Sequence, residues 1–168
     1  MHTIYLGLGS NIGDRERNLQ TALQELNRPD LRILRVSGVY ETEPLEMRAQ
    51  GWFLNLVAEA ETSLFPRQLL SRIAGIERRL GRKRAVPKGP RTLDIDILLY
   101  RKFVMQTDSL TIPHPRMAER RFVLQPIVDL APEMRHPVLR KTMRELLGET
   151  TGQIVRRVDF TPVLAQME

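Results

Sequence analysis

The sequence predicts an α+β protein with a mainly antiparallel sheet and helices packed on it. Short segments with apolar residues at every second position alternate with longer segments whose apolar residues recur every three or four positions. These are the periods of strands and helices. The chain has 168 residues, of which 42% are apolar and 27% charged, as in ordinary globular proteins. We therefore expect one domain over residues 1–168.

Residue patterns near the N-terminus predict the first strand and the first helix. Residues 4–8 carry apolar side chains at alternate positions and predict a strand. Asp14 can cap a helix in which leucines at 19, 23 and 26 recur at helical spacing. Gly7, Gly9 and Gly13 are spaced one residue too widely for a dinucleotide-binding fingerprint, so we set that interpretation aside.

Two further strands and a long loop follow. Residues 31–40 are rich in β-forming side chains, and residues 54–61 alternate again. Between them, residues 41–51 predict a loop of about a dozen residues, a length that usually binds a ligand or moves.

A second helix and a basic loop come next. Pro66 is expected at the start of the helix, and apolar residues then recur along one face. Gly81 is expected to end the helix, at the position after its C-cap residue. Residues 82–91 then contain five basic side chains and no acidic one. This basic loop leads directly into the next strand.

The C-terminal third predicts additions to a simple core. We expect a hairpin pairing 103–104 with 110–112, a largely helical segment over 116–130 broken at Pro126, and a short helix begun by a capping box at Thr142. Residues 154–158 can add an edge strand. The preceding order, β-α-β-β-α-β, is the ferredoxin-like plan.

The strand after the basic loop carries two aspartates. Its alternation predicts four core-facing side chains: Leu93, Ile95, Ile97 and Leu99. The opposite face then presents Thr92, Asp94, Asp96 and Leu98. The two carboxylates would lie about 6.5 Å apart at their Cβ atoms and point the same way.

A cation between these carboxylates would relieve their repulsion. Oxygen ligands favour Mg²⁺, which is usually held by one or two carboxylates together with substrate phosphates. The alternative is that Asp94 and Asp96 form the solvated face of an edge strand. The basic loop before them favours a polyphosphate site, although no P-loop and no protein-kinase catalytic motif occurs in the chain.

Composition excludes several kinds of metal site and several classes of protein. The chain has no cysteine, which excludes disulfides and thiolate metal sites, and its three histidines are scattered. There is no apolar run near the ~18 residues of a membrane span and no signal-peptide pattern, so we expect a cytoplasmic protein that binds no membrane. The net charge of +6 is compatible with an anionic partner, or with an arginine-rich coding bias alone.

Several motifs together resemble one known family. They are Gly9-Ser10-Asn11, Glu41-Thr42-Glu43-Pro44-Leu45, Phe53-Leu54-Asn55, Gly81-Arg82, Gly89-Pro90-Arg91-Thr92-Leu93-Asp94-Ile95-Asp96 and Pro113-His114-Pro115. Over about residues 4–133 the chain resembles the 6-hydroxymethyl-7,8-dihydropterin pyrophosphokinases of folate biosynthesis. The resemblance implies transfer of pyrophosphate from ATP to the pterin hydroxymethyl group, with release of AMP, by a ferredoxin-like domain.

The resemblance also implies roles for individual residues. Asp94 and Asp96 would hold two Mg²⁺ ions, and the expected catalytic residues are Arg82, Arg91, Asp94 and Asp96. The ATP-binding set implied is Glu77, Arg82, Arg84, Arg91, Ile97, Thr111, His114 and Arg120. Lys88 stands where many members of the family carry an aromatic residue, and a lysine there could reach a phosphate instead.

The implied pterin site combines aromatic faces with a polar edge. Its residues are Thr42, Glu43, Pro44, Leu45, Phe53, Asn55 and Phe122. A pterin is flat and polar at its rim, so it needs aromatic rings for stacking and an amide such as Asn55 that both donates and accepts. By composition alone, Phe53 and Phe122 could equally be core residues, and His114 between two prolines could be a turn residue.

Two other functions use the same features. A basic RNA-binding module could be built on a ferredoxin-like sheet, but it needs aromatic residues on the central strands, and aromatics are 5% of this chain. Another Mg²⁺-dependent phosphotransferase or a nuclease could use the same carboxylates. Our leading expectation is a monomeric pyrophosphokinase whose partners are ATP and the pterin, and not nucleic acid.

Overall fold

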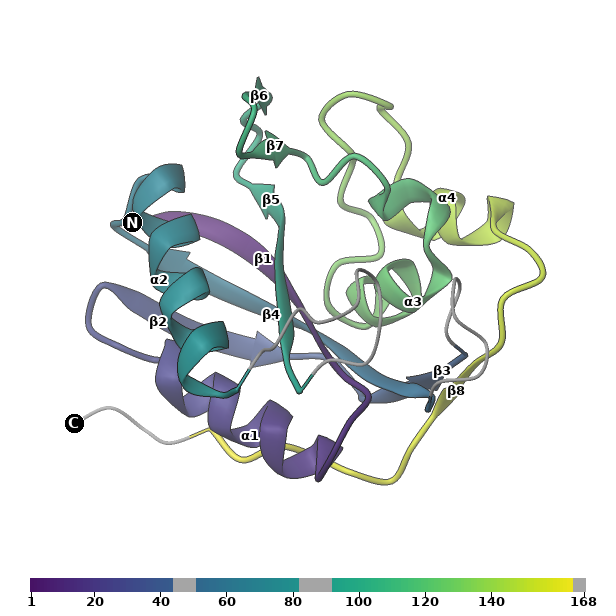
Figure 1. Cartoon of the computed structure of the whole chain (residues 1–168). Helices are drawn as coiled ribbons and strands as arrows, with labels where there is room; N and C mark the ends of the chain where they lie inside the picture. Colours follow the sequence, from purple (N-terminus) through teal and green to yellow (C-terminus); the bar gives the residue numbers. More distant parts are fainter. Residues whose placement is uncertain (44–50, 82–91, 165–168) are drawn as a thin grey trace.

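The computed structural model describes residues 1–43, 51–81 and 92–164 (Figure 1). The main sheet is formed by β1 (His2–Ser10), β2 (Leu31–Val36), β3 (Tyr40–Thr42), β4 (Phe53–Thr62), β5 (Asp94–Tyr100) and β8 (Val155–Arg157). The strand order is β5-β1-β4-β3-β8, and β2 also pairs with β4. Every pairing is antiparallel. Taking β2 and β3 as one interrupted strand, this is the expected ferredoxin-like order.

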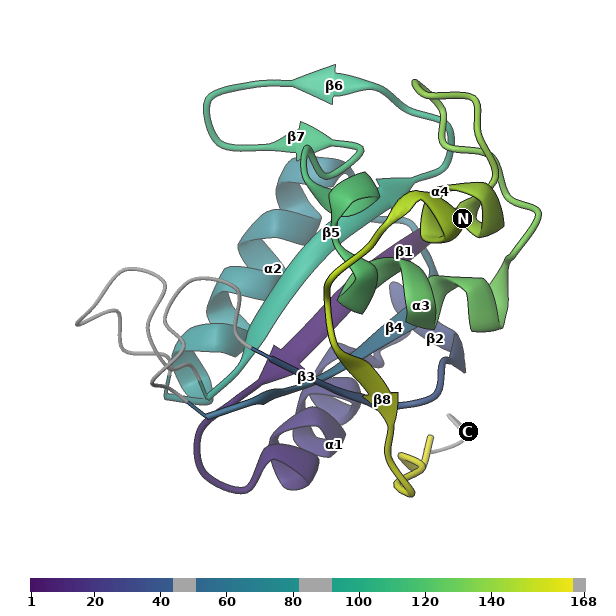
Figure 2. The same ribbon diagram turned by 90° about the vertical axis from the view of Figure 1, so that its right-hand side faces the viewer.

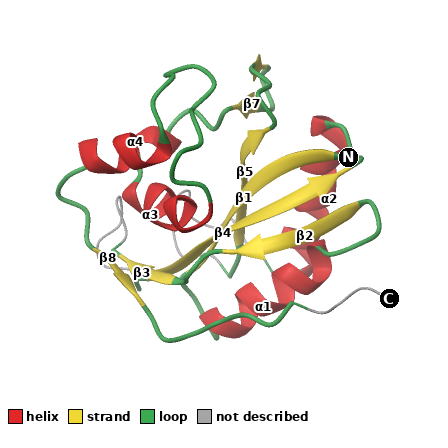
Figure 3. Ribbon diagram, turned by 180° about the vertical axis from the view of Figure 1, so that it is seen from behind, coloured by secondary structure: helices red, strands yellow, loops and turns green. Residues whose placement is uncertain are grey.

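Helices cover the two faces of the sheet differently (Figures 2 and 3). On one face lie α1 (Arg15–Leu26) and α2 (Pro66–Arg79); on the other lie the 3₁₀ turn η1 (Met117–Glu119), α3 (Arg121–Leu130) and α4 (Met143–Glu149). Each face has its own apolar cluster, a large one under α1 and α2 and a smaller one under α3 and α4. Within the described ranges, no helix is long and apolar enough to cross a membrane.

The local signals for helix ends are confirmed. The Asp14 side chain accepts a hydrogen bond from the Arg17 N–H at 3.1 Å and caps α1. Pro66 begins α2, and Gly81 follows its last turn with a φ of 85°, a left-handed conformation that glycine adopts without strain. The Thr142 hydroxyl accepts from the Glu145 N–H at 3.1 Å and caps α4.

Two expected elements are placed differently. The hairpin strands are β6 (Met105–Gln106) and β7 (Thr111–Ile112), so the strand expected at 103–104 is wrong. Phe103 lies in the turn after β5, where its ring stacks on Tyr100 at a centroid distance of 5.4 Å. The break expected at Pro126 is also wrong, because α3 continues through this residue. Burial of Val123, Leu124 and Ile127 offsets the backbone hydrogen bond that proline removes.

A register shift corrects one prediction on β5. Tyr5 pairs with Leu99 but Leu6 pairs with Ile97, so Leu98 is an extra residue in the ladder. Beyond this bulge the alternation changes phase. Leu99 therefore packs under α3 with Tyr5, not in the α1/α2 core with Ile95 and Ile97, and Tyr100 takes the core position instead.

The C-terminal segment wraps around one edge of the sheet. After α4 it adds β8 beside β3 and then runs along α1, seen as the yellow trace in Figure 1. Val158, Phe160 and Leu164 pack against the larger core. The Gln20 amide donates to the Val163 carbonyl at 2.6 Å and accepts from the Val163 N–H at 2.8 Å. This segment thus connects the two helical layers.

Candidate active site

The strand register places the predicted metal ligands and a predicted pterin ligand on one face. Gly9 on β1 pairs with Asp94 on one side and with Asn55 on the other. Directly paired residues of antiparallel strands project from the same face. Asp94, Gly9 and Asn55 therefore form a row across three strands, and Asp96, Gly7 and Val57 form the next row. Since Val57 packs under α3, both aspartates face that side of the sheet.

Glycine at the middle of these rows lets a neighbouring side chain lie against the β1 backbone, the Asn55 amide at Gly9 and the Leu98 side chain at Gly7. A Cβ built on Gly9 would lie 2.6 Å from the Asn55 Oδ1, closer than real contacts allow. It would also lie 3.5 Å from the Phe53 ring. Sequence reasoning considered these glycines as a nucleotide fingerprint, and Gly9 also as part of a family motif, but missed this role. The available signal was glycine inside a strand pattern, which often marks the close approach of a ligand or another backbone.

The predicted pterin ligands on β3 and β4 lie together. Asn55 is buried and donates from its Nδ2 to the Thr42 hydroxyl at 2.7 Å. Thr42 pairs with Phe53, so all three side chains share the face of Asp94. Because the Thr42 hydroxyl holds the Nδ2, the Asn55 Oδ1 is directed over Gly9. The amide therefore presents an oriented acceptor at the floor of the site.

His114 and Arg120 come from the segment after β7. The His114 backbone N–H donates to the Leu98 carbonyl at 2.9 Å, which attaches this segment to β5. Burial, and then the positive charge of Arg120, lower the pKa of His114 to about 4, while the charge of Asp94 opposes the shift. His114 is therefore neutral at pH 7. Its Nδ1 accepts from the Arg116 N–H at 3.2 Å, which leaves the proton on Nε2.

Arg120 also connects His114 to a predicted pterin residue. Its guanidinium carbon lies 5.5 Å from the centroid of the Phe122 ring. His114 is thus close enough to Asp94 and Arg120 for both charges to affect its pKa, and Arg120 links it to Phe122 at the start of α3. Phe122 packs at the margin of the α3/α4 cluster and is only partly buried.

Glu77 and Ile97 lie on the α1/α2 side of β5, the strand that carries the two aspartates. The buried Glu77 Oε2 accepts from the Ile95 N–H at 3.0 Å, so α2 satisfies a donor on the free edge of β5. The Ile97 side chain lies in the α1/α2 core and is 5% exposed. Any contact of Ile97 with a nucleotide would therefore use its backbone. Thr111 is half-buried in β7, opposite Gln106.

Of the remaining predicted residues, Glu43 alone lies in the part of the chain that the structure describes. Arg82, Arg84, Arg91, Pro44, Leu45 and also Lys88 lie outside the described residues. Glu43 is described, and its carboxylate accepts from the Ile154 N–H at 3.4 Å, toward the C-terminal segment.

A polar cluster that sequence reasoning missed secures the chain before Phe53. Arg15 donates to the Trp52 carbonyl at 2.8 Å and to the Glu41 carboxylate at 2.9 Å. Arg156 also binds Glu41 and lies over the Trp52 ring, 5.5 Å from its centroid. Hydrogen bonds from Arg156 and Arg15 lower the pKa of Glu41. No local motif signals this cluster, because its members come from α1, β3, β8 and the residue before β4.

The donor set suits magnesium better than a metal held by protein alone. In the part of the chain that is described, no group of three or more His, Cys, Asp or Glu residues could enclose an ion. Asp94 and Asp96 provide two carboxylates on one face, which matches Mg²⁺ that completes its shell with water and phosphate oxygens.

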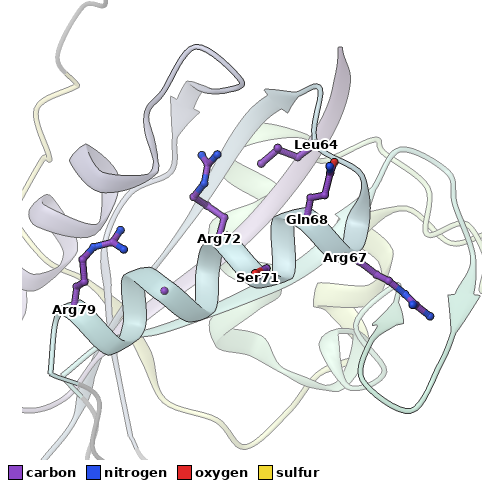
Figure 4. Close-up of a pocket in the computed structure, with 7 residues that line it drawn as sticks. Leu64, Arg67, Gln68, Ser71, Arg72 and Arg79 are labelled. Atoms are coloured by element: carbon purple, nitrogen blue, oxygen red, sulfur yellow. The ribbon is translucent and has the colours of Figure 1, made fainter.

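A shallow depression on α2 does not belong to this site. It is lined by Leu64, Arg67, Gln68, Ser71, Arg72, Gly75 and Arg79 (Figure 4). Arg72 forms two hydrogen bonds with Asp30, at 3.0 and 2.8 Å, and Arg79 pairs with Glu25 at 3.2 Å. Figure 4 shows Arg67 pointing away from both. These arginines do not converge on one ligand, and we place the chemistry on the Asp94 face.

Comparison with known proteins agrees with this geometry. Residues 5–132 match the family described as 7,8-dihydro-6-hydroxymethylpterin-pyrophosphokinase. The chain is 43% identical over 151 residues to the 2-amino-4-hydroxy-6-hydroxymethyldihydropteridine pyrophosphokinase of Aquifex aeolicus, covering 90% of this chain and 94% of that one. It is 45% identical over 131 residues to the protein of the same name from Bacillus subtilis, covering 77% and 78%.

A solved structure shares the fold. The Plasmodium falciparum HPPK-DHPS A437G variant with SDX-DHP superimposes with a TM-score of 0.74 at 19% identity. The match covers 88% of this chain and 45% of the longer Plasmodium protein.

Proposed function

The chain belongs to the 7,8-dihydro-6-hydroxymethylpterin-pyrophosphokinase family, and from this membership we propose its reaction. It transfers the β,γ-pyrophosphoryl group of ATP to the hydroxymethyl oxygen of 6-hydroxymethyl-7,8-dihydropterin, in folate biosynthesis. The hydroxymethyl oxygen attacks the β-phosphorus in line and loses its proton to water. The bond from the β-phosphorus to the oxygen bridging it to the α-phosphorus breaks, and AMP leaves.

The observation that carries this proposal is the row Asp94–Gly9–Asn55. It places a carboxylate suited to a phosphate-bound cation and an oriented amide suited to a heterocycle edge on the same face, on either side of Gly9. A reaction between a polyphosphate and a flat polar acceptor needs these two sites next to each other. Glycine at position 9 leaves room for the Asn55 amide against the β1 backbone.

We assign the acceptor side to β3, β4 and α3. The Asn55 amide, which donates a hydrogen bond to Thr42, also hydrogen-bonds to the polar edge of the pterin, and the rings of Phe53 and Phe122 stack on the pterin faces. The backbone around Glu43, Pro44 and Leu45 contributes further polar contacts.

We assign the phosphate side to β5, the basic loop, α2, β7 and the residues that flank η1. Asp94 and Asp96 would hold two Mg²⁺ ions, which would neutralise charge on the phosphates. Arg82 and Arg91, with Arg84, bind the transferred group, and Glu77, Ile97, Thr111, His114 and Arg120 form the nucleotide side. A neutral His114 suits this position, because it can donate from Nε2 without needing a counter-charge.

Product analysis tests the proposal. Purified protein is supplied with ATP, Mg²⁺ and the hydroxymethyl dihydropterin, and we expect AMP to appear in a 1:1 ratio with pyrophosphorylated pterin. Excess EDTA should abolish turnover, and added Mg²⁺ should restore it. ADP as the nucleotide product, or no product, would overturn the assignment, and cleavage of added RNA would indicate a nuclease.

We also propose that residues 1–168 act as one domain and as a monomer. The described strands form one continuous sheet apart from the β6–β7 hairpin, and the C-terminal segment returns to pack on α1. Sedimentation velocity during turnover conditions should give a single species of 19.4 kDa.

A further inference from the structure

The start of α3 is held by a side chain from the C-terminal segment. Arg120 separates η1 from α3 in an extended conformation, and no side chain of the preceding residues caps the helix. The first N–H groups of a helix lack partners within the helix. Here the Arg121 N–H donates to the Gln153 Oε1 at 2.8 Å. The Gln153 Nε2 donates in turn to the Glu119 carbonyl at 2.8 Å.

The Gln153 side-chain amide therefore binds the backbone of the residues on both sides of Arg120, and we call these two hydrogen bonds the Gln153 bracket. A second contact strengthens the connection, since the Arg121 guanidinium donates to the Thr150 carbonyl at 3.1 Å. The next residue after Gln153 also contacts the acceptor side, because the Ile154 N–H donates to the Glu43 carboxylate. Gln153 thus stands between the start of α3 and the end of β3.

The bracketed backbone carries two residues of the proposed site. Arg120 lies over the Phe122 ring, and their positions depend on the course of the chain from Glu119 to Phe122. The Arg120 backbone bonds within its own segment: its N–H donates to the Met117 carbonyl at 3.2 Å, and its carbonyl accepts from the Val123 and Leu124 N–H groups at 3.0 Å. The two bonds to the half-buried Gln153 add a restraint from another segment, on the residues at either side of Arg120.

We propose that Gln153 is a positioning residue for pterin and nucleotide binding. Resting on the proposed function, it acts through the backbone on Arg120 and Phe122 and does not touch substrate. The C-terminal segment is then part of the binding machinery, in addition to its packing role.

A matched pair of substitutions tests this role. Gln153→Met keeps the length and volume of the side chain but removes both hydrogen bonds. Gln20→Met is the control, because Gln20 is also half-buried and makes the same pair of amide bonds to this segment, but at Val163 on the α1 side. Gln153→Glu keeps the acceptor for Arg121 and loses the donor to Glu119.

We expect Gln153→Met to raise KM for the pterin about 10-fold, the scale of losing two neutral hydrogen bonds partly replaced by water. The kcat at saturation should change less than about 3-fold, because the phosphate-side carboxylates are untouched. Gln153→Glu should fall between Gln153→Met and the unmodified enzyme, and Gln20→Met should match the latter. Equal KM in all four proteins, or an equal rise in both methionine variants, would overturn the proposal.

Amide hydrogen exchange gives a readout that needs no activity. The Arg121 amide should exchange at least about 10-fold faster in Gln153→Met, since its acceptor is gone, and should be unchanged in Gln20→Met. Unchanged exchange in Gln153→Met would refute the bracket itself. If the unmodified protein makes no AMP while Arg121 exchange responds as expected, the proposed reaction fails and the bracket stands.

Discussion

The two faces of the sheet differ in what fills them. On the α1/α2 face, side chains from β1, β4 and β5 form a closed apolar core with almost no exposed area. On the opposite face, a smaller apolar cluster that includes Tyr5, Val57 and Leu98 lies under α3 and α4, and the Tyr40 hydroxyl donates to Asp129 of α3. The rest of that face carries Asp94, Asp96, Thr42 and Asn55, with Gly7 and Gly9 between them.

The difference separates stability from function within single strands. Ile95 and Asp94 are neighbours on β5, yet one packs in the core and the other faces the site. Because strand side chains alternate between faces, a substitution on either face tests one property and leaves the other in place. The predictions below use this separation, from the largest expected effect to the smallest.

Leu56→Ala should reduce stability and spare catalysis. Leu56 is 1% exposed in the α1/α2 core, and truncating a buried leucine costs about 2–5 kcal/mol through lost burial and the cavity left behind. Urea unfolding should show this loss, while kcat at a temperature where the variant is folded stays within about 2-fold of the original. A large loss of kcat in the folded variant would mean that the two faces are coupled.

Asp96→Asn should give the opposite result. We expect turnover to fall at least about 10²-fold, equivalent to about 2.7 kcal/mol, as for the loss of one preorganised group that stabilises charge. Stability should fall much less than in Leu56→Ala, because asparagine keeps the size of the side chain and the core face of β5 is unchanged. Asp108→Asn, in the exposed turn of the hairpin, is the control and should keep full activity. Near-normal turnover in Asp96→Asn would contradict the assignment of Asp96 as a Mg²⁺ ligand.

The sequence predicted the alternation on these strands well, because period-two patterns report directly which side chains are buried. It placed Asp94 and Asp96 on one face and the capping residues Asp14, Pro66 and Gly81 at the correct helix ends. Its errors arose where tertiary contacts overrode a local rule. Leu99 changed face because of a bulge, and α3 continued through Pro126 because its apolar side was buried.

Long-range contacts could not be predicted from one sequence. The Gln153 bracket joins residues more than thirty positions apart, and the Arg15–Glu41–Arg156 cluster joins three separate segments. Such contacts depend on how the chain returns to the sheet, and no local pattern encodes that. The role of Gly9 likewise became visible only through its two strand partners.

Gly9→Ala and Gly7→Ala form a matched pair on β1. The added methyl group at Gly9 would lie 2.6 Å from the Asn55 Oδ1 and must displace the amide, whereas at Gly7 it would meet only the Leu98 side chain at 3.4 Å or more. We expect Kd for the pterin, measured by fluorescence titration, to rise about 10-fold for Gly9→Ala and less than about 2-fold for Gly7→Ala. Equal affinities in both variants would show that the space over Gly9 is not used.

Arg72→Met should have the smallest effect and tests whether the α2 depression matters. Arg72 and Asp30 are partly exposed, so their ion pair should contribute only about 0.5 kcal/mol to stability. Arg72 lowers the pKa of Asp30 from its ordinary 3.8, so the pair stabilises the fold fully above that value and loses its contribution as the pH falls through the lowered pKa. Urea unfolding should therefore show a small deficit in Arg72→Met at pH 7 that closes in acid, while the KM for ATP stays unchanged. A raised KM for ATP would place a nucleotide contact in this depression, away from the Asp94 face.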